Sequence, residues 1–164
     1  MDGVAFVFSA SLYAGHIKVV ADDSQVDVYT VDRKTGVFHG QSDSVVCKKI
    51  GGRSYAVGAA SVKVDEVMCN QRRIKMYKRM LSSSETFIGS DGLQYKWKVK
   101  GMCSAYLWVD GGSEHLLAVY TAESRFWSRC PAVLTVYADA LGMLDEVVVT
   151  CVYIARKIQM LQDG

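Results

Sequence analysis

Five basic residues crowd into one short segment of the chain, NQRRIKMYKRMLSS. If this segment is a β-strand, Arg73, Lys75 and Arg79 project from one face, because alternate side chains of a strand point the same way. Lys96 and Lys98 form a second alternating basic run. A cation near an anionic membrane leaflet contributes about 1 kcal/mol to binding. The two runs therefore predict a face that grips a phosphorylated lipid head group; the alternative is two ordinary solvated strand faces.

An aromatic group follows further along the chain. Tyr120, Phe126 and Trp127, together with Arg125, would form a platform on which a base, a sugar or another ring stacks. Such a platform favours a glycan-binding or defence protein. The alternative is a barrel rim that packs beneath a loop.

The chain has no obvious catalytic pattern. The three histidines lie far apart and lack a neighbouring acid and nucleophile. The five cysteines and three histidines have none of the spacings of metal sites, and the glycine pairs match no nucleotide-binding motif. We therefore predict no metal and no cofactor, and we assign no catalytic residues. A non-enzymatic binding module is the leading prediction; a small enzyme of secondary metabolism, a cyclase or isomerase built around a cavity, is the alternative.

Length and composition indicate one domain over residues 1–164, since half of the residues are hydrophobic and 22% are charged. The formal net charge of +2 is too small to imply a nucleic-acid partner by itself. Five scattered cysteines favour a reducing compartment. The N-terminus lacks the basic start of a signal peptide, and the longest apolar run is shorter than the roughly 20 residues that span a bilayer. We therefore expect a cytoplasmic protein without a transmembrane segment, peripheral to a membrane if it binds lipid.

Short runs rich in Val, Tyr, Ile and Thr succeed one another along most of the chain, as pleated sheets prefer. Turn residues such as Ser90-Asp91-Gly92 separate several of them. This succession predicts a mainly β domain, with strands over about 3–138, and an exposed strand edge would permit a homodimer. We expect the clearest strands at 5–9, 16–21, 25–31, 44–50, 54–62, 66–70, 95–100, 105–109, 115–121 and 132–137.

The segment 70–83 fits two patterns. As a helix it would start at Asn70, with Ile74, Tyr77 and Leu81 on one face. As a strand it would place the basic residues on one face and Ile74, Met76 and Met80 on the other. We favour a strand that runs into a short helical turn.

The C-terminal stretch LGMLDEVVVTCVYIARKIQML holds a nearly uncharged core. Its β-branched valines suit a strand, but its length without a turn signal favours a helix over about 141–161. Asp145 and Glu146 precede the core and Arg156 and Lys157 follow it, which complements a helix macrodipole. A helix that is apolar nearly all round must be enclosed by protein. We therefore predict a closed antiparallel barrel of about ten to twelve strands around a central C-terminal helix.

Two pieces of the chain, TFIGSDGLQYKWK at 86–98 and LDEVVVTCVYIARK at 144–157, resemble a family of small fungal proteins of basidiomycete type. In that family a T-F-x-G-x-D-G-x-x-Y-x-W hairpin precedes a closing aliphatic helix. The family is similar to the tubby C-terminal, LURP-one-related and phospholipid-scramblase group. Spacing and order match over the C-terminal half, whereas residues 1–70 match only as a loose succession of strands.

The resemblance implies the same kind of barrel, filled by its C-terminal helix. It also implies a phosphoinositide or another anionic membrane lipid as partner, bound by basic residues on the outer face of the barrel. Within the hairpin motif, Asp91-Gly92 would form a tight turn, and Phe87, Tyr95 and Trp97 would be core or barrel-wall aromatics.

Overall fold

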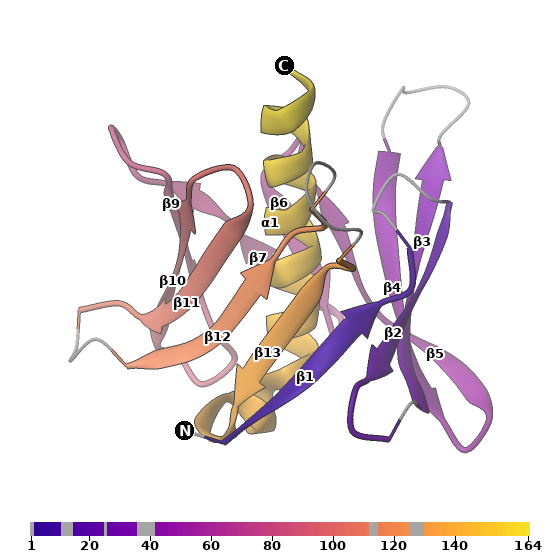
Figure 1. The fold of residues 1–164 in the computed structure, drawn as a ribbon. Coiled ribbons are helices and arrows are strands. Elements are labelled where there is room, and N and C mark those ends of the chain that lie inside the picture. Colours follow the sequence, from indigo (N-terminus) through magenta and orange to yellow (C-terminus); the bar gives the residue numbers. More distant parts are fainter. Residues whose placement is uncertain (1, 11–14, 25, 36–41, 112–114, 125–129) are drawn as a thin grey trace.

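A computed structural model describes residues 2–10, 15–24, 26–35, 42–111, 115–124 and 130–164. Within these ranges, a thirteen-stranded antiparallel sheet curls around one long C-terminal helix (Figure 1). A 3₁₀-helix, η1 Ala138–Met143, leads directly into the α-helix, α1 Leu144–Asp163. The strands are β1 Gly3–Phe8, β2 His16–Ala21, β3 Val26–Thr35, β4 Ser42–Ile50, β5 Arg53–Ser61, β6 Glu66–Cys69, β7 Arg72–Lys75, β8 Tyr77–Lys78, β9 Ser84–Ile88, β10 Gln94–Lys100, β11 Ser104–Val109, β12 Leu116–Thr121 and β13 Val133–Tyr137.

The sheet order is β7-β6-β5-β4-β3-β2-β1-β13-β12-β11-β10-β9-β8. Met76 alone separates β7 from β8, so one segment pairs with β6 through its first half and with β9 through its second. Arg72 adds a hydrogen bond from Nη1 to the carbonyl oxygen of Ile88 at the end of β9, 3.0 Å away. The result is a nearly closed barrel, which confirms the predicted fold class. The strand count of thirteen exceeds the ten to twelve expected.

Within the segment 70–83, residues 72–75 and 77–78 form strands, as favoured above, and the turn that follows them is not helical. Ile74 and Met76 point into the core, each 2% exposed. Met80, which the strand pattern places on the same face, does not join them in the core, because Met80 is 91% exposed. The strand ends at Lys78, so the alternation of side chains stops before Met80.

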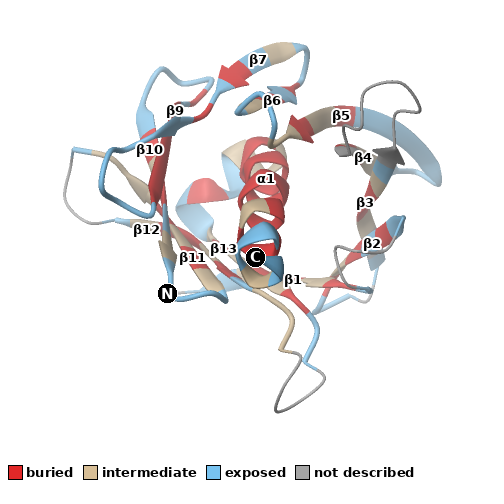
Figure 2. Cartoon of the chain, turned by 90° about the horizontal axis from the view of Figure 1, so that it is seen from above, coloured by how far each residue is buried: buried red, intermediate tan, exposed pale blue. Residues whose placement is uncertain are grey.

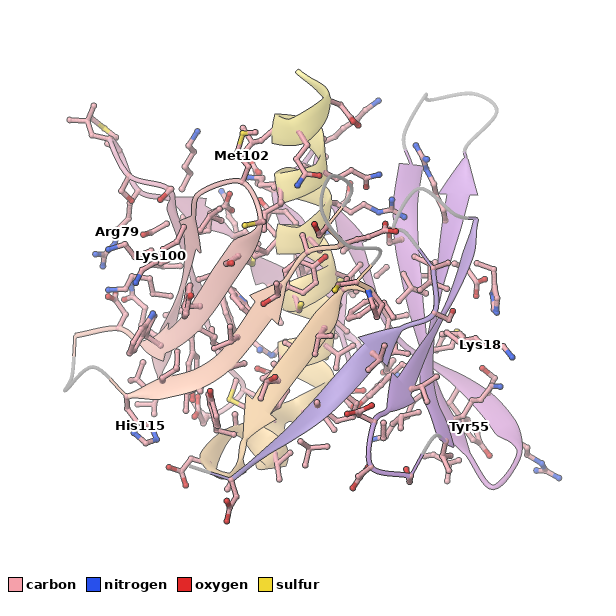
Figure 3. All side chains as sticks on the ribbon, viewed as in Figure 1. Lys18, Tyr55, Arg79, Lys100, Met102 and His115 are labelled. Carbon is pink, nitrogen blue, oxygen red and sulfur yellow. The ribbon has the colours of Figure 1, made fainter. Side chains whose placement is uncertain are left out.

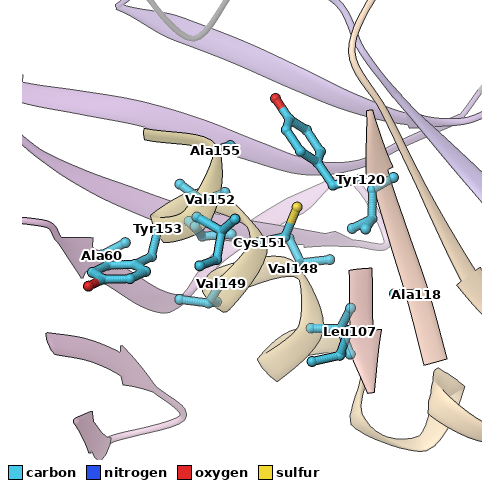
Figure 4. Packing of buried hydrophobic residues seen from close by; sticks show 14 of the residues in the cluster. Ala60, Leu107, Ala118, Tyr120, Val148, Val149, Cys151, Val152, Tyr153 and Ala155 are labelled. Carbon is cyan, nitrogen blue, oxygen red and sulfur yellow. The ribbon is translucent and has the colours of Figure 1, made fainter. Parts of the chain in front are cut away.

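The helix α1 runs through the middle of the ring of strands (Figure 2). Its residues 147–155 are all buried, and its valines lie among side chains of the surrounding strands (Figure 4). Valine is a weak helix former, but burial of an apolar surface on every side outweighs propensity. The helix approaches β5 closely at Gly58, where an added Cβ would lie 2.8 Å from Cγ2 of Val149. A side chain at this position would therefore separate helix and sheet.

The two sequence pieces that carry the family resemblance lie against each other. Trp97 of β10 donates its Nε1–H to Oγ1 of Thr150 on α1, 3.1 Å away in the core. The backbone N–H of Ser90, in the turn after β9, lies 3.2 Å from both carboxylate oxygens of Glu146. The hairpin and the helix therefore form one packing unit.

The interpretation of the motif aromatics as core residues is confirmed. Phe87 and Trp97 are 0% exposed and Tyr95 is 3% exposed. Phe87 stacks on Tyr95 with ring centroids 5.5 Å apart. Asp91 orders the turn by accepting hydrogen bonds from the N–H of Leu93 at 2.9 Å and from the hydroxyl of Tyr95 at 2.5 Å.

Candidate functional site

The two predicted basic runs meet on the outer wall of the barrel. Lys96 and Lys98 lie on β10, which is separated from β8 by β9 alone. Arg79 Nη2 pairs with Asp110 Oδ2, and Lys96 Nζ lies 3.4 Å from Asp110 Oδ1. The Asp110 side chain is only 9% exposed. One largely buried carboxylate thus joins the two runs.

The remaining cations of this wall, Arg73, Lys75 and Lys98, are exposed. Figure 3 shows Arg79 on the outside of the barrel. The Arg73 side chain is 74% exposed and its Nε lies 2.9 Å from Oε1 of Glu66. Lys75 Nζ lies 5.5 Å from the ring centroid of Tyr77. Acidic partners offset Arg73, Arg79 and Lys96, so Lys75 and Lys98 supply more of the wall's positive potential than the other three predicted residues.

The prediction that Tyr120 belongs to an exposed aromatic platform is wrong. Tyr120 is 1% exposed and points into the barrel, where its ring packs edge-on against Phe8 at 6.0 Å. A buried ring offers no stacking surface to a ligand. Arg125, Phe126 and Trp127 lie outside the described residues.

The connection between β8 and β9 presents two large hydrophobic side chains to solvent. Met80 is 91% exposed and Leu81 is 104% exposed. Leu81 has a φ of 61°, a region that leucine rarely occupies. The backbone N–H of Arg79 donates to the carbonyl oxygen of Ser84, 3.1 Å away, and closes the turn. The chain therefore holds these two side chains at the tip of an ordered hairpin.

A cleft of about 680 Å³ opens beside the C-terminal half of α1. One wall is the helix, and the other is formed by the β8–β9 hairpin and the end of β10. Its volume falls within the range of small-molecule sites in proteins. Its lining combines Lys78, Glu85, Lys157 and the serines 82–84 with the apolar residues Val62, Leu81, Val99, Ile154, Met160 and Leu161.

Two of the polar residues of the cleft belong to a cluster of four. Tyr153 Oη lies 2.7 Å from Asp65 Oδ1 and 2.7 Å from Glu85 Oε2. Lys157 Nζ lies 2.9 Å from Asp65 Oδ1 and pairs with Glu85 Oε1. One ammonium and one phenol therefore serve both carboxylates, at the boundary between the core and the cleft.

Burial raises the pKa of Tyr153, and the two carboxylates raise it further. Burial alone would also raise the pKa of Asp65, but hydrogen bonds from Tyr153 and Lys157 outweigh it and lower that pKa. At neutral pH the phenol is thus protonated and Asp65 is ionised. The cluster is suited to hydrogen bonding rather than to proton transfer by Tyr153.

The prediction that Arg156 and Lys157 complement the negative end of the helix dipole is wrong. The helix continues to Asp163, and its last turn holds no basic residue. Arg156 instead donates from Nε to Oγ of Ser44, 3.0 Å away, and burial together with the charge of Arg33 lowers its pKa to about 10. Lys157 belongs to the cluster beside the cleft.

The acids at the start of α1 lie in its first turn, as predicted. Asp145 accepts hydrogen bonds from the hydroxyl of Tyr29 at 2.5 Å and from Nζ of Lys48 at 3.0 Å. Glu146, whose side chain is 8% exposed, has its Oε1 3.3 Å from Nη2 of Arg72. These contacts bind the helix start to three strands, a role that no local pattern reveals.

Sequence patterns miss most of the cleft. Glu85 has the same strand parity as the buried Phe87, and Tyr153 lies four positions before Lys157 on the helix. Together these spacings would have indicated polar side chains that face inward and share one helix face. Asp65 carries no such signal, because it lies in a turn with a φ of 51°.

Within the described ranges, no group of three or more His, Cys, Asp or Glu side chains is arranged to hold a metal ion. None of the helices in these ranges combines the length and apolar character needed to cross a bilayer.

The model of a family of unknown function, DUF6593, matches residues 15–160. No curated protein and no solved structure matches the chain. The family match runs from the start of β2 to near the end of α1, so it covers most of the barrel and the cleft. The chain therefore belongs to the DUF6593 family.

Proposed function

We propose that this protein is a non-enzymatic module that binds anionic phospholipid surfaces. The exposed hairpin tip carries this proposal. Met80 and Leu81 are 91% and 104% exposed, and Lys78 and Arg79 immediately precede them. Exposed large hydrophobic side chains beside cations are typical of proteins that insert into the interface of an anionic bilayer.

The two parts of this surface contribute differently to binding. Full burial of one methionine or leucine side chain contributes about 1.5–3 kcal/mol, which salt does not screen. Each cation close to an anionic leaflet adds about 1 kcal/mol, which salt does screen. The tip therefore supplies affinity, and Lys75 and Lys98 supply the preference for anionic head groups.

The resemblance to tubby-like barrels supports phosphoinositides as the first lipids to test. Weaker contributions to head-group binding come from Arg73, Arg79 and Lys96, because acidic neighbours offset their charges. A protein with this function would be cytoplasmic and peripheral to the membrane.

Co-sedimentation with vesicles tests the proposal. Vesicles of phosphatidylcholine alone, with phosphatidylserine, or with a phosphoinositide are compared at low and physiological salt. Wild type should pellet with the anionic vesicles and lose part of its binding as salt rises. Met80→Ser/Leu81→Asn should weaken binding at every salt concentration, whereas Lys75→Glu/Lys98→Glu should remove the preference for anionic lipid.

Leu93→Ser is the matched control. Leu93 is 51% exposed in the turn at the opposite end of β9, so its substitution removes exposed apolar surface away from the tip. This variant should bind as wild type does. Absence of binding to all three vesicle types, or equal effects of the tip and control variants, would refute the proposal.

The cleft favours a second candidate, a cavity-based cyclase or isomerase. Its apolar lining and the nearby pair of Glu85 and Lys157 are the kind of surroundings such chemistry uses. Incubation with linear and cyclic hydrocarbon substrates, followed by mass spectrometry, tests it. Product that forms with wild type and fails to form with Glu85→Gln would favour the enzyme over the binding module.

A further inference from the structure

We infer that the cleft beside the C-terminal half of α1 binds one single-chain anionic amphiphile, a molecule with an alkyl chain and a carboxylate or phosphate head. This site is distinct from a membrane-binding surface, because it encloses one molecule and needs no bilayer. It shares Leu81 with the hairpin tip, but Met80 is not part of its lining.

The apolar part of the cleft suits an alkyl chain. The helix wall runs from Ile154 to Leu161, a rise of about 10 Å, which is long enough to lie along an extended chain of eight or so methylene groups. Met160 and Leu161 are each 61% exposed although they line a concave surface. An alkyl chain between the helix and the hairpin would cover both side chains and remove this apolar area from water.

The polar part of the cleft has spare hydrogen-bond donors. Glu85 Oε1 pairs with Lys157, and Glu85 Oε2 shares the one hydroxyl hydrogen of Tyr153 with Asp65. Lys157 has three N–H donors and two carboxylate partners, which leaves one donor for a ligand. Lys78 adds an exposed ammonium to the same lining.

The charge and size of the cleft therefore favour one occupant. An anionic head accepts hydrogen bonds from Lys78 and from the third N–H of Lys157, while its chain lies against the helix. A cationic head would meet the ammonium groups of Lys78 and Lys157, while Glu85 Oε1 and Asp65 Oδ1 are already paired with Lys157. A volume of about 680 Å³ holds a single-chain amphiphile, and it falls within the range of small-molecule sites.

Isothermal titration calorimetry below the micelle concentration tests the inference without membranes. Dodecanoate and dodecyl phosphate represent the two sources of the anionic head, and dodecyltrimethylammonium is the cationic control. We expect one saturable site for at least one of the two anions, at least about tenfold tighter than for the cation. The better anion identifies the head group that the site prefers.

Variants locate the site. Met160→Ser/Leu161→Ser removes two apolar side chains from the wall and should weaken binding of the anion at least about tenfold. Lys78→Gln should reduce the discrimination between anion and cation. Met80→Ser, which alters the hairpin tip alone, and Leu93→Ser should bind the amphiphile as wild type does. Unchanged melting temperatures show that each variant is folded.

The inference is overturned if neither anion binds saturably, if the cation binds as tightly as the anions, or if Met160→Ser/Leu161→Ser leaves affinity unchanged. Its failure is separable from that of the proposed function. Amphiphile binding without vesicle binding refutes the membrane proposal alone, and vesicle binding without amphiphile binding refutes the cleft alone.

Discussion

The buried hydrogen bond between Trp97 and Thr150 leads to a stability prediction that can be worked from geometry. Trp97 Nε1 lies 3.1 Å from Thr150 Oγ1, and both residues are 0% exposed. Thr150→Val keeps the shape of the side chain but removes the acceptor, so the indole N–H is left buried without a partner. Such a group costs about 1–3 kcal/mol. We expect Thr150→Val to lower the free energy of unfolding by about 2 kcal/mol.

A double-mutant cycle isolates the bond. Trp97→Phe removes the donor, so adding Thr150→Val in that background creates no unpaired N–H. The threonine hydroxyl also contacts the carbonyl oxygen of Glu146, 2.7 Å away, but that oxygen keeps its helical partner when the hydroxyl is lost. Thr150→Val should therefore cost about 1–2 kcal/mol less in the Trp97→Phe background than in wild type.

Urea unfolding followed by far-ultraviolet circular dichroism measures all four free energies. Thr150→Ser is the matched control, because it keeps the hydroxyl and loses one methyl group, at a cost of about 1 kcal/mol. If the two single substitutions add within about 0.3 kcal/mol, the bond contributes nothing and the reasoning is refuted. If Thr150→Ser lowers the free energy of unfolding as much as Thr150→Val does, the loss comes from packing and not from the hydrogen bond.

Three further predictions concern other parts of the barrel. Gly58→Ala should lower the free energy of unfolding by about 2 kcal/mol, because its Cβ would collide with a carbonyl oxygen of β6 and a valine methyl of α1. Gly142→Ala, whose Cβ would meet nothing within 4 Å, should not lower it, and equal costs in urea titrations would contradict the close approach of helix and sheet. Burial alone would raise the pKa of Asp145, but hydrogen bonds from a tyrosine and a lysine lower it below its ordinary value of 3.8. The stability that Asp145 adds is therefore present above that value and lost as pH falls through the folded-state pKa. The difference in unfolding free energy between wild type and Asp145→Asn should shrink on acidification, and a constant difference would argue against this ion pairing. Cys103 is exposed and should react with a thiol reagent in the native protein, whereas Cys151, whose pKa is raised by complete burial, should react only after unfolding. Rapid native labelling of both thiols would contradict the enclosed helix.

Local pattern predicts the elements of this fold well. Strand alternation and turn residues are properties of adjacent positions, so most strands of the barrel can be read from them. The terminal helix can be read from its length and its uniform apolar character, which also implies that protein surrounds it. The strand segment 72–78 is harder to predict from sequence, because half of it pairs with β6 and half with β9. Neither half is a long strand by itself.

The two basic runs on the outer wall of the barrel show which contacts a local sequence pattern cannot predict. Alternation predicts that Arg73, Lys75 and Arg79 share a face, because that depends only on strand geometry. It says nothing about Asp110, which pairs with Arg79 and with Lys96, because contacts between remote residues arise only when the sheet closes.

Only the tertiary structure decides the cleft and the hairpin tip. The lining residues of the cleft lie between positions 62 and 161 of the sequence, and only the folded chain brings them together. Strand alternation places Met80 on the face of Ile74 and Met76, but Met80 lies two residues past the end of β8, where the alternation no longer holds. Side-chain burial depends on which segments pack over a residue, and this is a property of the closed barrel rather than of neighbouring positions in the chain.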